Sequence, residues 1–155
     1  MPYLDKAASV IETSSEGIME FMGPAKAQTI AQAENDLEVK FPAAYREFLE
    51  RYGQGSAGPF EIYGLKPGDD EPGEEGFDVV SQTSFARTGG LPFEFVVIYS
   101  LGNGEEYVLD CTQGDDPPIL AWSEGIWDDT SRMEVVEPSF SAFLLDRAER
   151  ASNGA

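Results

Sequence analysis

The side chains that could do chemistry in this chain are almost all carboxylates. The sequence contains 29 Asp and Glu residues, a single cysteine, Cys111, and no histidine. Without histidine, the chain lacks the commonest general base near neutral pH, the commonest metal ligand and every Ser-His or Cys-His nucleophile pair. The carboxylate of Asp110 is expected to raise the pKa of the Cys111 thiol and to make it less reactive. We therefore interpret Cys111 as a small residue of the core or of a strand end.

Paired carboxylates are the remaining candidate catalysts, because two acids that flank a glycosidic bond are enough for hydrolysis. Such pairs arise by chance among 29 acids, and the sequence places no two of them in one cleft. A carboxylate-based hydrolase would need two acids that converge in a pocket, at least one of them with a raised pKa. No zinc pattern, dinucleotide fingerprint or Walker motif is found in the sequence. These observations argue against an enzyme, and they predict no cofactor and no metal.

Two segments have superficial features of ligand-binding loops. The glycine-rich residues 53–58 suggest a phosphate loop, but no strand precedes them and no Lys-Ser or Lys-Thr pair follows them. We interpret them as a helix cap and a flexible connector. The five acids of residues 66–77 suggest calcium, but their spacing does not match the twelve-residue EF-hand loop. A solvated acidic loop that contacts a partner is the better interpretation.

The net charge of the chain is −19, and it is unevenly distributed. Residues 1–60 have a net charge of −4, from nine acids and five bases, whereas residues 61–137 have −15, from eighteen acids and three bases. Such a potential repels nucleic acid and membrane surfaces and accelerates the encounter with a basic protein. The alternative is that the acidic surface only keeps the protein soluble or reflects a salt-rich habitat, since the chain has only four lysines.

Length and composition favour one domain over residues 1–155. A chain of 155 residues, of which 41% are hydrophobic, can form one core and is short for two. The sequence has no signal-peptide pattern and no apolar run near the ~20 residues of a membrane helix. A lone cysteine cannot form an internal disulfide. We expect a cytoplasmic protein.

The hydrophobic periodicity predicts helices first, then strands, then a last helix. Four apolar or aromatic residues from Tyr45 to Tyr52 have the i, i+3, i+4, i+7 spacing of an amphipathic helix, which Gly53 ends as a left-handed cap. The expected helices are 25–39, 42–52, 82–87 with Phe85 pointing inward, and a last helix capped by Ser139; the expected strands are 60–65, 93–99, 106–110, 119–122 and 133–136. This order predicts an α+β domain with an antiparallel sheet of about four to six strands and helices packed on one side.

Two further local expectations concern a turn and the N-terminus. Residues 102–104, Gly-Asn-Gly, accept positive φ and predict a hairpin turn. Residues 1–23 are ambiguous, because Leu4 to Ile11 have helical spacing while Ile18 to Met22 form a second apolar patch before the Gly23-Pro24 break. The sequence leaves open whether residues 1–23 pack on the domain or extend from it.

An ordered series of short motifs runs through most of the chain. The series contains Glu34, Leu37, Phe41-Pro42, Tyr45, Phe48-Leu49, Tyr52-Gly53, Ile62-Tyr63-Gly64-Leu65, Leu91-Pro92, Tyr107-Val108-Leu109-Asp110, Ala121-Trp122 and Phe143-Leu144. In this order the motifs resemble the SMI1/KNR4 family of the SUKH superfamily, over about residues 28–148. We interpret their aromatic residues as packing residues rather than binding residues, and these are Tyr45, Phe48, Tyr63, Trp122 and Phe143.

The resemblance implies a binding module. Bacterial members of the superfamily are typically immunity proteins, which neutralise a toxin delivered by a neighbouring cell, and fungal relatives act in cell-wall and signalling regulation. A small acidic domain is suited to cover a basic surface such as a nuclease active site. The alternative is a regulatory or scaffold domain for an endogenous protein partner. We expect a monomer or weak homodimer that contacts neither nucleic acid nor membrane directly.

The predicted partner-binding surface consists of two acidic loops. The first loop supplies Asp69, Asp70, Glu71, Glu74 and Glu75, and the second supplies Glu124, Trp127, Asp128 and Asp129. Trp127 is the expected exposed anchor, because large aromatic residues often dominate the binding energy of an interface.

Overall fold

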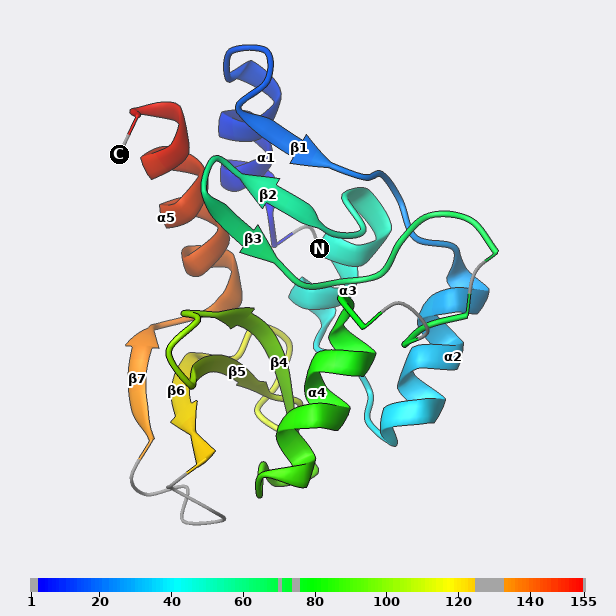
Figure 1. The fold of residues 1–155 in the computed structure, drawn as a ribbon. Coiled ribbons are helices and arrows are strands. Elements are labelled where there is room, and N and C mark those ends of the chain that lie inside the picture. The colour runs from blue at the N-terminus through cyan, green and yellow to red at the C-terminus, as the bar shows by residue number, and fades with distance from the viewer. Residues whose placement is uncertain (1–2, 70, 74–75, 125–132, 155) are drawn as a thin grey trace.

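The computed structural model describes residues 3–69, 71–73, 76–124 and 133–154 (Figure 1). These ranges contain helices α1 (Asp5–Thr13), α2 (Ala27–Leu37), α3 (Ala43–Arg51), α4 (Val79–Thr88) and α5 (Phe140–Ser152). They also contain strands β1 (Met19–Phe21), β2 (Gly55–Ala57), β3 (Phe60–Ile62), β4 (Phe95–Ser100), β5 (Glu105–Asp110), β6 (Ile119–Ser123) and β7 (Glu134–Glu137). The predicted α+β class is confirmed.

The strands form two antiparallel sheets rather than one. The first sheet has the order β1-β2-β3 and the second the order β4-β5-β6-β7. A hydrogen bond from the backbone N–H of Tyr63 to the carbonyl of Ile98 (2.9 Å) joins the end of β3 to β4. Ile98 lies where the pairing of β4 with β5 shifts register, between Val97 and Tyr99. The irregularity therefore coincides with the point where the first sheet meets the second.

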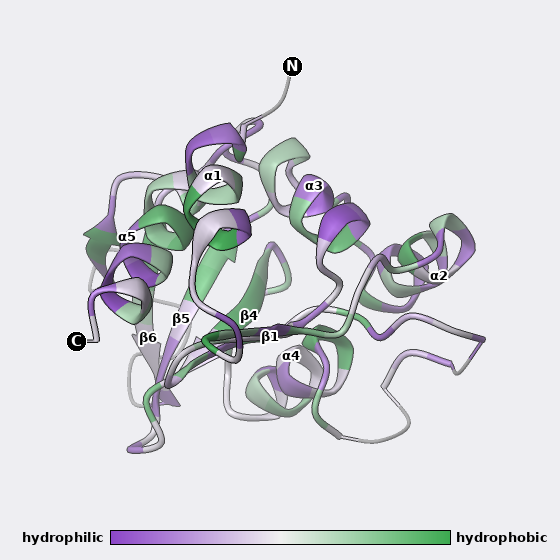
Figure 2. Ribbon diagram, turned by 90° about the horizontal axis from the view of Figure 1, so that it is seen from above, coloured by the Kyte–Doolittle hydropathy of each residue, from purple (hydrophilic) through white to green (hydrophobic). Residues whose placement is uncertain are grey.

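The second sheet is covered by helices on both faces, whereas the sequence predicts helices on one side. One face contributes Val96 and Ile98 to the main core with α3 and α5, and the other contributes Phe95 and Val97 to a smaller core with α4. Figure 2 shows α4 and α5 on opposite sides of β4. The cause lies in β4, where all residues from Phe95 to Ile98 are buried. Such an unbroken apolar run is typical of a strand covered on both faces.

Helix α4 begins three residues before its predicted start, and this changes which of its faces is buried. Asp78 and Ser81 form a capping box, in which the N–H of Ser81 donates to Oδ1 of Asp78 (2.9 Å). Val79, Thr83 and Ala86 then face the sheet at i, i+4 and i+7. The prediction that Phe85 points inward is wrong, because Phe85 falls on the opposite face and is 78% exposed.

The strand boundaries near the glycine-rich segment also differ from the predicted ones. Residues 53–58 contain strand β2 and are not only a connector, and the strand predicted at 60–65 ends at Ile62. The hairpin turn is confirmed, since β4 pairs with β5 around Gly102 and Gly104, which have φ of +80° and +92°. The Ser139 cap is confirmed as well, because its Oγ accepts a hydrogen bond from the N–H of Ala142 (3.1 Å).

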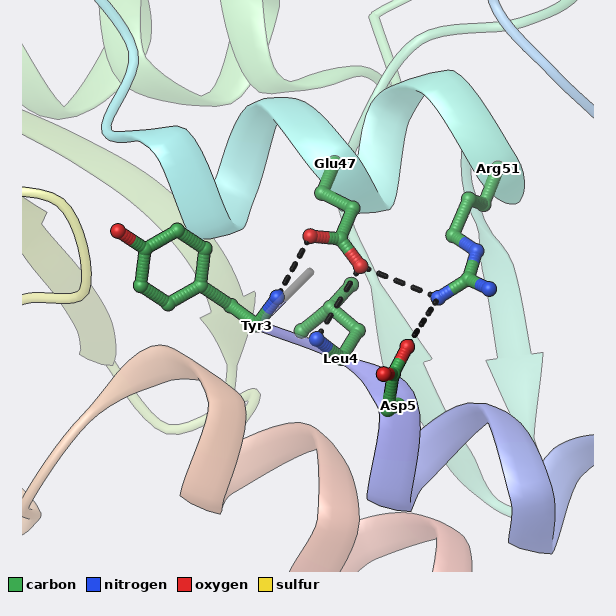
Figure 3. A network of polar contacts seen from close by, with 5 residues as sticks. All are labelled: Tyr3, Leu4, Asp5, Glu47 and Arg51. Carbon is green, nitrogen blue, oxygen red and sulfur yellow. Dashed lines mark hydrogen bonds and ion pairs between the residues drawn. The ribbon is translucent and has the colours of Figure 1, made fainter. Parts of the chain in front are cut away.

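The N-terminal residues pack on the rest of the fold (Figure 3). Leu4 and Ile11 are buried in the main core, and α1 lies against α5. Leu4 is the N-cap of α1 and makes no side-chain cap, and Glu47 of α3 instead binds the N–H groups of Leu4 and of the residue before it. Oε1 of Glu47 accepts from the N–H of Tyr3 (2.7 Å), and Oε2 accepts from the N–H of Leu4 (3.1 Å) and from Nη1 of Arg51 (3.1 Å). A carboxylate from another helix thus caps α1.

Replacing Glu47 by alanine should release the start of α1. We expect Glu47→Ala to lower the free energy of unfolding by about 1–2 kcal/mol, the usual cost of losing a charged cap. The amides of α1 should also exchange faster with solvent, which hydrogen exchange followed by NMR or mass spectrometry measures. Glu50→Ala, an exposed acid on the same helix, is the matched control. Equal exchange rates in α1 for the two variants would contradict the capping role.

Candidate functional site

Three of the nine predicted partner-binding residues lie in the described part of the chain. They are Asp69, Glu71 and Glu124. The other six lie outside the described residues, namely Asp70, Glu74, Glu75, Trp127, Asp128 and Asp129. Asp69 forms an ion pair with Lys26, next to the start of α2, and Glu71 is exposed beside α2.

The structure does not bring Asp69 and Glu124 together. The acidic loop that contains Asp69 leads into the start of α4, where the N–H of Gly73 donates to Oδ2 of Asp78 (2.6 Å). Glu124 lies at the other end of α4, against Gly89. A helix of ten residues is about 15 Å long, so Glu124 lies about that far from the start of α4, to which the segment after Asp69 leads. A partner that contacts both would have to cover the outer face of α4.

A pocket of about 120 Å³ lies between α4 and the second sheet. We call it the α4 pocket, and its lining includes Phe85, Gly89, Gly104, Glu106, Trp122 and Glu124. Glu106 and Trp122 are direct partners in the register of β5 and β6, so both side chains lie on the face that meets α4. Trp122 is buried and confirmed as a packing residue, while Phe85 is exposed at the rim.

Glu106 is the electrostatically unusual residue of the α4 pocket. Its Oε2 is shielded from solvent and has no hydrogen-bond partner among the described residues. Burial raises the pKa of the Glu106 carboxyl above its usual value, and a hydrogen bond with Ser100 acts in the opposite direction. Ionisation of this carboxyl is therefore less favourable in the pocket than in water, and a nearby cation would favour it.

A groove of about 310 Å³ lies on the outer face of the first sheet. Glu20, Ser56 and Glu61 form one cross-strand row there, since Glu20 pairs with Ser56 and Ser56 with Glu61. Two exposed apolar side chains, Met22 (50%) and Phe77 (68%), also line the groove. The groove thus combines carboxylates with apolar contact area, as the α4 pocket does.

Tyr63 connects the groove with the α4 pocket. It lines the groove and packs against the smaller core that contains Trp122. Its pKa is raised first by burial, then by the negative charges of Glu106 and Glu61. Since Tyr63 lines the groove and packs against the core beneath the α4 pocket, we group the two hollows together. We call the combined surface the acidic face, which consists of Glu20, Met22, Glu61, Tyr63, Phe77, Phe85, Glu106, Trp122 and Glu124.

The sequence prediction missed most of the acidic face. Glu61 is exposed between the half-buried Phe60 and the buried Ile62, a period-two pattern that indicates an acid on the outer face of the sheet. The segment Glu105–Asp110 gives no such signal, because Glu105, Glu106 and Tyr107 are all half-buried. By contrast, the exposure of Phe85 can be predicted only when Val79 and Val80 are counted in α4, because they identify its buried face. Neither the groove nor the pocket is lined by Lys or Arg among the described residues.

The α4 pocket formally meets the requirement for a carboxylate hydrolase, because two acids converge in it and the pKa of Glu106 is raised. Its volume argues against that role. Pockets for organic ligands measure about 300–1,000 Å³, whereas this one is about 120 Å³. It has room for one side chain rather than for a sugar.

Cys111 is also unsuited to nucleophilic chemistry. Burial raises the pKa of its thiol to about 12, with a smaller contribution from Asp110. The direction agrees with the sequence prediction, but burial and not the neighbouring carboxylate is the main cause. Because the thiolate is the nucleophile, a thiol with this pKa is almost entirely inactive near neutral pH.

The raised pKa of Glu106 has a consequence for folding that can be measured. Since the folded state favours the protonated form, the ionised carboxylate opposes folding above that pKa. We expect Glu106→Gln to raise the free energy of unfolding at pH 7 and to lose this gain as the pH falls toward 4. Urea denaturation at both pH values measures it.

Glu105→Gln is the matched control for this variant. It removes the same charge from a chain with a net charge of −19, but from the opposite face of β5. If both variants stabilised the protein equally at pH 7, the effect would come from general charge repulsion and not from the α4 pocket.

No helix in the described residues is long and apolar enough to cross a membrane. No curated protein matches the chain. A family model does match it, SUKH_5, described as SMI1-KNR4 cell-wall, over residues 5–149. The match begins near the start of α1, well before residue 28, which agrees with the packing of α1 on α5. Because the model covers nearly the whole chain, this protein belongs to the SMI1/KNR4 family of the SUKH superfamily.

Proposed function

We propose that this protein is an immunity protein, which binds a cognate toxin and neutralises it by covering a basic surface of the toxin. The acidic face is the observation that carries this proposal. It combines four carboxylates with large exposed apolar side chains, and no basic residue lines its two hollows among the described residues. Membership of the SMI1/KNR4 family is consistent with such a role.

Charge and apolar contact would act at different stages of binding. A net charge of −19 steers a basic partner toward the protein and raises the association rate. Phe77 and Phe85, 68% and 78% exposed, would then lose water against the partner and slow its dissociation. A nuclease-like toxin fits this division, because its active site must attract phosphates and is therefore basic.

The role requires binding only and no catalysis by this chain. Glu124 remains in the proposed interface, and Asp69 and Glu71 would extend its rim beyond the start of α4. Asp69 already has an intramolecular partner in Lys26, so its charge is partly compensated. We therefore assign the main contribution to Glu61, Glu106 and Phe85.

Identification of the partner tests the proposed function. The tagged protein is purified from its own strain, the co-purifying proteins are identified, and the leading candidate is expressed in a sensitive host. We expect a basic toxic domain whose growth inhibition is relieved by co-expression of this protein. A partner that is not toxic, bound through the same face, would overturn the immunity role in favour of a regulatory or scaffold domain.

Changes on the acidic face should weaken partner binding without loss of fold. We expect Phe85→Ser and Glu61→Lys each to reduce affinity for the identified toxin at least about 10-fold, which corresponds to about 1.4 kcal/mol. Titration calorimetry measures the affinity, and thermal denaturation should show little change because both side chains are exposed. The control is Val135→Ser, which alters an apolar residue of β7 that is 62% exposed and lines neither hollow. An equal loss of affinity in this control would contradict the assigned face.

A further inference from the structure

We propose that the α4 pocket receives one arginine side chain of a basic protein partner. The inference rests on the proposed function and deepens it, because it names the group that the acidic face recognises. It predicts the chemistry of a single contact, and this contact can be examined with a small molecule in place of the toxin.

The carboxylates of the pocket are arranged for a ligand with several donors. Oε2 of Glu106 is shielded and lacks a hydrogen-bond partner among the described residues. Glu124 follows β6, and its side chain lies next to Gly89 and lines the same pocket. A guanidinium group has five N–H donors in a fixed plane and can serve two acceptors at once. A partner's arginine would therefore satisfy an oxygen that has no hydrogen-bond partner among the described residues.

The aromatic lining favours arginine over lysine. Phe85 and Trp122 line the pocket beside the two carboxylates. A planar and weakly hydrated guanidinium stacks on aromatic rings, whereas an ammonium group is compact and strongly hydrated. The chain itself places guanidinium groups over rings elsewhere, with Arg87 4.4 Å from the ring centre of Phe93 and Arg147 4.7 Å from that of Phe143.

Size and charge are consistent with an occupant from another molecule. About 120 Å³ is below the volume of typical organic-ligand pockets and suits the end of one side chain. Arg87, the arginine of α4, is turned away, since its Nη2 donates to the carbonyls of Leu37 (2.9 Å) and Phe93 (2.8 Å). This arginine is held at the opposite side of α4 and does not fill the pocket.

Titration with ethylguanidinium, followed by ¹⁵N NMR, tests the pocket directly. We expect saturable shifts of the Gly89 and Gly104 amides and of the Trp122 indole N–H, with a dissociation constant of about a millimolar, as suits so small a ligand. Ethylammonium at the same ionic strength should bind at least about fivefold more weakly. If the two cations caused equal shifts, or if ethylguanidinium caused none at these positions, the arginine pocket would be overturned.

Three variants separate charge from position. Glu106→Gln should reduce ethylguanidinium affinity at least about fivefold, whereas Glu105→Gln, which removes the same charge on the other face of β5, should leave it nearly unchanged. Gly89→Ala keeps every charge, but its Cβ would lie 3.0–3.2 Å from Cγ, Cδ and Oε1 of Glu124 and displace that carboxylate. Its φ of −96° suits alanine, so the fold should survive while the affinity falls. Equal loss in Glu105→Gln would reduce the effect to general charge attraction and contradict the pocket.

The outcomes distinguish the pocket from the proposed function. Toxin binding without a guanidinium response would overturn the arginine pocket and leave the immunity role intact. A specific guanidinium response in a protein whose partner is not toxic would support the pocket and overturn the immunity role.

Discussion

The structure depends on a junction of three residues, Tyr63, Gly64 and Leu65, whose backbone groups form hydrogen bonds that join two helices and both sheets. The N–H of Tyr63 donates to β4, and its carbonyl accepts from the buried Tyr45 hydroxyl of α3 (2.6 Å). The carbonyl of Gly64 accepts from the first N–H of α4 (2.9 Å), and the N–H of Leu65 donates to the carbonyl of Gly53 (3.0 Å). A Cβ on Gly64 would lie 1.8 Å from that carbonyl oxygen, so only glycine fits.

This junction also sets the geometry of the acidic face. The N–H of Val79 donates to the carbonyl of Gly64, which fixes the start of α4 next to the end of β3. The direction of α4 from this point places Phe85 at the rim of the second sheet. Tyr63 has its backbone in the junction and its side chain between the groove and the α4 pocket. Packing residues therefore position the candidate site, and two of them, Tyr63 and Trp122, also line its hollows. This explains why family motifs such as Tyr63-Gly64-Leu65 indicate the fold more readily than the site.

Local patterns were sufficient to predict α3, the β4–β5 hairpin, the Ser139 cap and the α+β class, because each depends on neighbours in the sequence. The capping of α1 by Glu47 was beyond such reasoning, since it joins residues 43 positions apart. The predicted orientation of Phe85 was wrong because residues 79–81 were left out of the helix. With them included, Val79, Thr83 and Ala86 form the buried stripe, and at about 100° per residue Phe85 falls on the opposite face. The two acidic loops were grouped by composition, and only the length of α4 shows that Glu124 lies at the other end of that helix from the segment that contains Asp69 and Glu71.

The arrangement of the acids favours binding over solubility as their purpose. Solubility requires exposed carboxylates in polar surroundings, where ionisation costs nothing and large apolar side chains are avoided. The acidic face has the opposite properties: burial raises the pKa of Glu106, Phe85 is largely exposed in the same pocket, and Phe77 is largely exposed in the groove. Both features oppose the stability or solubility of the free protein. A basic partner would compensate both at once, because its cation would stabilise the carboxylate and its surface would cover the rings.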